Sequence, residues 1–132
     1  MRLTICMTAA LALCAYATQV EAKAKPAPAA KATFQLDGTT WLYTDPKGTK
    51  VRESIDADGN YISQTRAGKH LDHGTAVMKG DKACFTSAMT KEGEVCWSTS
   101  PVKIGHSLKT VSNKGEKLKV TRVAYVKLSM PK

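Results

Sequence analysis

Residues 50–66 read KVRESIDADGNYISQTR, two short runs with β-branched and aromatic residues on either side of Asp56-Ala57-Asp58-Gly59-Asn60. Gly, Asn and Asp are the residues that accept the backbone conformations of a tight turn. The stretch therefore predicts a β-hairpin, with strands near residues 50–55 and 60–66.

The same alternation of run and turn extends in both directions from this hairpin. Turn signals recur at 45–48, 67–68, 79–81, 91–93, 100–101 and 113–115, and the remaining strand-like segments lie near 39–44, 74–79, 82–88, 94–99, 105–112 and 117–128. About eight short strands at this spacing predict an all-β fold, an antiparallel up-and-down meander that closes into a small barrel. A five-stranded OB-like barrel, in which some segments merge or are loops, and a β-sandwich are the alternatives.

The last segment has the clearest alternation of apolar and polar residues. One parity carries Leu118, Val120, Ala124, Val126 and Leu128, and we expect that parity to face the interior. Arg122 falls on the same parity. Because burying an unpaired charge is costly, we expect Arg122 to be partly buried against an aromatic or hydrogen-bonding partner.

The chain has 132 residues, enough for one small domain. Residues 1–22 predict a secretory signal peptide that is cleaved between Ala22 and Lys23. Its apolar stretch is shorter than the ~20 residues that a membrane-spanning helix needs, so no transmembrane segment is expected after cleavage. Residues 23–33, KAKPAPAAKAT, predict a disordered tether, and residues 34–132 a single barrel domain. The expected location is periplasmic or secreted.

Four cysteines are present, and cleavage would remove Cys6 and Cys14. An even pair in an exported chain is typical of a disulfide. We therefore predict a disulfide between Cys84 and Cys96. The alternative, a metal-binding or redox thiol pair, lacks a Cys-x-x-Cys spacing and a nearby His.

Basic residues are concentrated at the C-terminal end. The formal net charge is +9, and the segment 103–132 holds eight Lys and Arg against Glu116 alone. A face of the sheet with this charge would attract anionic partners, although lysines also protect an edge strand from aggregation. The predicted basic face comprises Lys109, Lys114, Lys117, Lys119 and Lys127.

Patterns that would indicate a metal site are weak. Asp56 to Asn60 resembles the start of a calcium loop, but Tyr61 stands where an EF-hand requires Gly and Ala67 where it requires Glu. His70-Leu71-Asp72-His73 offers imidazole and carboxylate ligands in what we expect to be a surface loop. We predict no metal and no cofactor.

Catalytic patterns are equally weak. The serines lack a Gly-x-Ser-x-Gly elbow, and Glu92 and Glu94 flank a turn where solvent would keep both ionised. A titrating pair would have to come from His106 with Glu53, or from His70 with His73. We predict that the protein is not an enzyme.

Gly38-Thr39-Thr40-Trp41 at the first strand and Arg122 on the last resemble the calycin arrangement of lipocalin-like barrels. There a first-strand Trp packs beneath a last-strand Arg, so the resemblance implies that Trp41 and Arg122 form a structural clamp at a closed end. The spacing departs from the family's Gly-x-Trp by one residue. The chain from Gly38 to Trp97 is also similar to small proteins that Gram-negative bacteria export, which implies a compartment but no activity.

The favoured function is that of a non-enzymatic binding module that engages an anionic envelope component or an acidic protein through the basic face. Inhibition of a secreted hydrolase or protease and carriage of a small ligand are the alternatives. With eight aromatic residues in the whole chain, we expect the interior to be filled by side chains, and a cavity of several hundred Å³ would instead favour ligand carriage. We expect a monomer that binds no nucleic acid.

Overall fold

The computed structural model describes residues 34–132, and the predicted signal peptide and tether lie outside the described residues. The described part is all β, with no helix. Its strands are β1 (Thr39–Thr44), β2 (Lys50–Ile55), β3 (Asn60–Thr65), β4 (His70–Lys79), β5 (Lys82–Ser87), β6 (Glu94–Ser98), β7 (Ser107–Val111) and β8 (Lys117–Val123). No helix in this part of the chain is long and apolar enough to cross a membrane.

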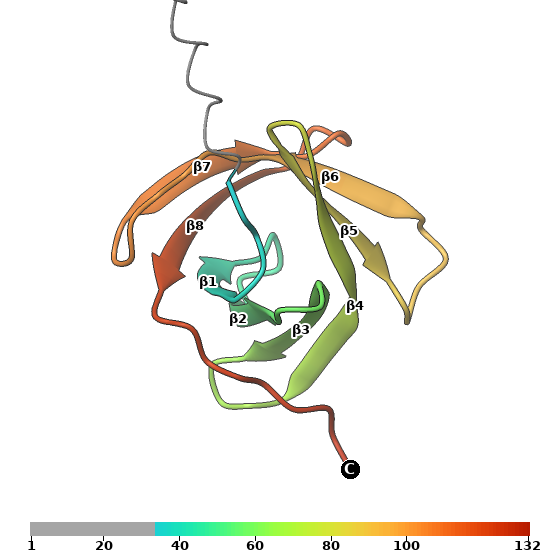
Figure 1. Ribbon diagram of the computed structural model, residues 1–132. Helices are drawn as coiled ribbons and strands as arrows, with labels where there is room; N and C mark the ends of the chain where they lie inside the picture. The colour runs from blue at the N-terminus through green and yellow to red at the C-terminus, as the bar shows by residue number, and fades with distance from the viewer. Residues whose placement is uncertain (1–33) are drawn as a thin grey trace, which may run out of the picture. The chain divides into compact units, whose positions relative to one another are not determined.

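All eight strands belong to one antiparallel sheet in the order β6-β5-β4-β3-β2-β1-β8-β7. Figure 1 shows the strands arranged as a ring, with β6 and β7 next to each other where the ring closes. The first strand meets the last through the pairs Thr40↔Val123, Trp41↔Arg122 and Leu42↔Thr121. The predicted eight-stranded meander barrel is confirmed, and the OB-like and sandwich alternatives are wrong.

The seam between β6 and β7 is closed more loosely than the other strand pairs. One bridge joins Trp97 to Ser112. Beside it, Asn113 N donates to Cys96 O at 2.9 Å, and Thr110 Oγ1 donates to Ser98 O at 2.6 Å. Backbone and side-chain hydrogen bonds therefore join β6 and β7 without a regular ladder.

The hairpin predicted for residues 50–66 is present as β2 and β3. Asp56 Oδ1 accepts hydrogen bonds from the backbone N–H groups of Asp58 and Asn60, each at 2.9 Å, and these bonds lower the pKa of Asp56. Gly59 has a φ of 79°, a conformation that glycine adopts without strain. A β-turn therefore accounts for all the residues that resembled a calcium loop.

Two predicted strand boundaries are wrong by four or more residues, and the others agree to within two. β4 begins at His70 instead of Gly74, because residues 66–69 make a short turn in which Thr65 N donates to Lys69 O at 2.8 Å. His70 and His73 therefore lie on a strand and not in a loop.

β8 ends at Val123 instead of Leu128. Its neighbour β1 begins at Thr39, which would lie opposite Ala124, so the residues after Ala124 have no β1 residue to pair with. Val126 N donates instead to Thr40 Oγ1 at 2.8 Å. Val126 is 38% exposed, so the inward position predicted for it is wrong.

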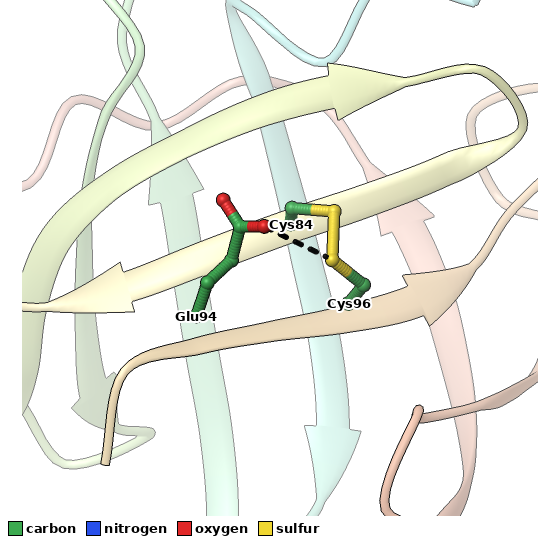
Figure 2. A group of neighbouring side chains, drawn as sticks. All are labelled: Cys84, Glu94 and Cys96. Carbon is green, nitrogen blue, oxygen red and sulfur yellow. Dashed lines mark hydrogen bonds between the residues drawn. A yellow bond between two sulfur atoms is a disulfide. The ribbon is translucent and has the colours of Figure 1, made fainter.

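The predicted disulfide between Cys84 and Cys96 is present. The two residues lie directly opposite each other on β5 and β6, as Figure 2 shows. Their sequence neighbours Ala83, Phe85 and Trp97 face the interior, so by strand alternation the disulfide lies on the outer face. It ties β6, the strand at the weak seam, to the rest of the sheet.

A hydrophobic core fills one end of the barrel. Its buried members are Leu36, Trp41, Ile55, Tyr61, Ala76 and Ala83, with Phe34, Met78, Phe85, Val102, Leu108 and Val120 packed around them. This end carries the β2–β3 and β4–β5 turns, because Ile55 ends β2 and Tyr61 lies near the start of β3. The other end is not filled in this way.

Candidate functional site

The barrel encloses a cavity of about 360 Å³. Aromatic side chains from five inward positions line it: Trp41, Tyr43, Tyr61, Phe85 and Trp97. Leucines and valines, with small residues such as Ala83 and Ser63, complete the wall. The expectation of a filled interior is wrong, because the side chains that line the barrel leave this volume unoccupied.

Glu53 is a carboxylic acid that lines the cavity from β2. It lies on β2 between Val51 and Ile55, whose side chains are buried, and it points to the lumen. Tyr43 Oη donates to Glu53 Oε2 at 3.1 Å. Burial raises the pKa of Glu53 to about 7, with the nearby Asp72 charge acting in the same direction and the Tyr43 hydrogen bond opposing it.

Asp72 is held by a denser set of hydrogen bonds. Tyr61 Oη donates to Asp72 Oδ2 at 2.8 Å, and Ser87 Oγ and the backbone N–H of His73 donate to Oδ1 at 2.6 and 2.8 Å. Burial, and then the hydrogen bond to Asp72, raise the pKa of Tyr61. Tyr61 therefore stays a protonated donor, and both oxygens of Asp72 are occupied by the protein.

Three further carboxylates line the cavity from turns at one end of the barrel. Asp45 follows β1, Glu92 precedes β6 and Glu116 precedes β8. In an up-and-down barrel these turns lie at the same end, opposite the core. Glu92 is 3.7 Å from Lys114 Nζ, and both side chains are well exposed. We call these three residues the acidic rim.

The predicted basic face lies on the outside of the β7–β8 hairpin and beyond it. Lys109 and Lys119 are directly opposite each other, and Lys117 is opposite Val111. Lys114 is in the turn and Lys127 follows β8. All five lysines are exposed. Their proposed role in binding an anionic partner stays a prediction.

Trp41 and Arg122 are partners in the β1–β8 ladder. Arg122 Nη1 donates to Val102 O at 3.0 Å, and the guanidinium carbon lies 6.0 Å from the centre of the Phe34 ring. Phe34 in turn meets Trp41 edge to face, with ring centres 6.0 Å apart. Phe34, which was not among the predicted site residues, therefore lies close to both Trp41 and Arg122.

The histidines are not brought together with Glu53. His70 and His73 lie on β4 with ring centres 5.3 Å apart, and His106 is exposed in the connection between β6 and β7. No hydrogen bond or ion pair joins His106 to Glu53 among residues 34–132.

Within the described residues, Cys84, Glu94 and Cys96 are a group whose ligand atoms lie within 4.8 Å of one another (Figure 2). Both sulfurs are used in the disulfide, and thiolates rather than disulfides bind metals. The Glu94 carboxylate accepts from Lys79 Nζ at 2.7 and 2.8 Å. The group is explained as a cross-strand disulfide beside an ion pair.

Sequence reasoning missed most of the cavity residues. For Glu53 a signal existed, because it shares a parity with Val51 and Ile55, just as Arg122 shares one with Leu118 and Val120. Asp72 was considered only as a metal ligand in an expected loop, so its place in the cavity was missed. Comparison of the chain with protein-family models, curated proteins and solved structures found no match.

Proposed function

We propose that this chain is a non-enzymatic binding protein, periplasmic or secreted, that holds one small organic molecule inside its barrel. The observation that carries the proposal is the 360 Å³ cavity with its aromatic and aliphatic wall. Ligand sites in proteins are concave, mostly apolar and fitted with a few polar groups that set orientation. Here Glu53 and Asp72 are those polar groups.

The chemistry of the cavity supports binding over catalysis. Tyr43 and Tyr61 are protonated donors whose pKa values are raised by burial. Ser87 donates its hydroxyl to Asp72 and is used in positioning that carboxylate.

Calorimetric titration with tryptophol, a neutral indole alcohol, tests the proposal. We expect saturable binding at one site per chain. Leu118→Trp, which adds bulk to an inward side chain of β8 that lines the cavity, should weaken binding about tenfold or more, equivalent to roughly 1.4 kcal/mol.

Lys119→Trp is the matched control, because it places the same side chain on the outer face of the same strand. It should leave the affinity unchanged, and circular dichroism should show that both variants fold. A wild type that binds neither tryptophol nor its charged indole analogues, or equal loss in the two variants, would contradict the proposal.

The outer surface of the β7–β8 hairpin is a second candidate site. Lys109 and Lys119 face each other across the strand pair, and like charges in this position repel each other. An anionic partner would relieve that repulsion. Inhibition of a secreted hydrolase or protease stays a prediction from the sequence.

A further inference from the structure

The charge of the cavity is opposite to that of the protein. The chain has a formal net charge of +9, yet the cavity lining within the described residues contains no Lys, Arg or His. It contains five carboxylates: Asp45, Glu53, Asp72, Glu92 and Glu116. Because low-dielectric walls focus the field of charges that line a cleft, these carboxylates favour a cation over an anion among the residues that line the cavity.

The Glu53 carboxylate has one oxygen inside the barrel that is available to a ligand. Both oxygens of Asp72 already accept hydrogen bonds from the protein. Glu53 accepts only from Tyr43, on Oε2, so its Oε1 has no protein donor within the described residues. An ammonium group there would form a charge-assisted hydrogen bond.

The aromatic wall of the cavity can pack against the apolar body of such a ligand. Trp41, Tyr43, Tyr61, Phe85 and Trp97 surround the carboxylates. Tyr61 and Phe85 already meet edge to face with ring centres 5.3 Å apart. Aromatic faces attract organic cations and pack against apolar bodies, and a cavity of this size accommodates one small molecule of that kind.

A metal ion is a poorer match to these carboxylates. A metal requires several ligand atoms that converge on one point. Among the described residues, the three-residue group that comes close enough is Cys84, Glu94 and Cys96, outside the cavity. The cavity carboxylates are instead spread from the interior to the acidic rim.

We infer that the ligand is a small organic cation, a protonated amine on an aromatic or apolar body, with the ammonium group at Glu53 and the body against the aromatic wall. This inference rests on the proposed function.

Three indole compounds of matched shape test the charge of the ligand: tryptamine, a cation; tryptophol, which is neutral; and indole-3-acetate, an anion. The titrations are done at pH 8, because the pKa of Glu53 is about 7 and an aliphatic amine remains protonated there. We expect tryptamine to bind about tenfold or more tightly than tryptophol, and indole-3-acetate to bind most weakly.

Glu53→Gln should remove the advantage of tryptamine over tryptophol. Glu94→Gln, an equal change on the outer face, should preserve the advantage. If tryptophol binds and tryptamine binds no better, or if indole-3-acetate binds best, the inference is overturned while the proposed function stands. If none of the three compounds binds, both are overturned.

Discussion

Glu53 shows most clearly that the barrel interior is not built for stability alone. It stands between Val51 and Ile55 on the inward parity of β2, where an apolar residue would complete the wall. Its carboxylate has a single protein donor, Tyr43, and its burial disfavours the charged form. A half-buried acid whose charged form costs free energy and which is incompletely hydrogen-bonded is typical of a functional site.

Glu53→Gln should make the stability of the protein less dependent on pH. The folded-state pKa of about 7 lies above the ordinary value of 4.5, so the folded state holds the proton more tightly than the unfolded state. Stability from this group is full below pH 4.5, falls as the pH rises, and is lost above pH 7. The free energy of unfolding of the variant minus that of the wild type should therefore be larger at pH 8 than at pH 4, by up to about 3 kcal/mol.

Urea unfolding at pH 4, 6 and 8 measures this effect. Glu94→Gln is the control, since Glu94 lies outside the cavity and pairs with Lys79. If the wild type and Glu53→Gln lose stability in parallel between pH 4 and pH 8, the folded protein does not disfavour the charged form of Glu53.

At the scale of the strand, period-two alternation and turn residues were enough to predict most of the sheet. The bounds of β1 and β2 agree with the predicted segments, because each strand is flanked by a turn with its own Gly or Asp. The two errors, at the start of β4 and the end of β8, have tertiary causes. One depends on how tightly residues 66–69 turn, and the other on where the neighbouring β1 begins.

Gly74 is a further feature that only the folded strands explain. A Cβ atom at this position would meet the carbonyl oxygen of Thr86 at 2.0 Å and the ring of Tyr61 at 2.9 Å. The constraint comes from a neighbouring strand and from a side chain of β3. Neither lies near Gly74 in sequence, so the sequence alone could not identify it.

The β7–β8 hairpin carries the prediction about anionic partners. Sedimentation with phosphatidylglycerol vesicles should show binding that weakens as salt is added, since ions screen exposed charges. Lys109→Gln combined with Lys119→Gln should reduce binding severalfold, because both charges lie on one exposed surface. Lys47→Gln with Lys50→Gln, at the exposed β1–β2 turn, is the matched control. Equal binding by both double variants would rule out the hairpin as the binding surface.

At the scale of the whole molecule, the chain separates its charges between the two faces of one sheet. Lysines lie outward on β7 and β8, while five carboxylates line the cavity. The sequence revealed the outer half of this arrangement because the lysines cluster along the chain. It did not reveal the inner half, since Asp45, Glu53, Asp72, Glu92 and Glu116 are scattered and meet only when the barrel closes through β1 and β8. The volume of the cavity could not be predicted from the sequence either, because it depends on how the barrel closes.

The central claim is that a small molecule binds inside this barrel, and nuclear magnetic resonance of the two indole N–H groups tests it most directly. Both tryptophans of the chain, Trp41 and Trp97, line the cavity. Titration with tryptophol should shift both indole signals to saturation with one common dissociation constant, while the backbone amides of Lys109 and Lys119 stay in place. Indole signals that do not move, or saturable shifts confined to the outer β7–β8 hairpin, would contradict the account.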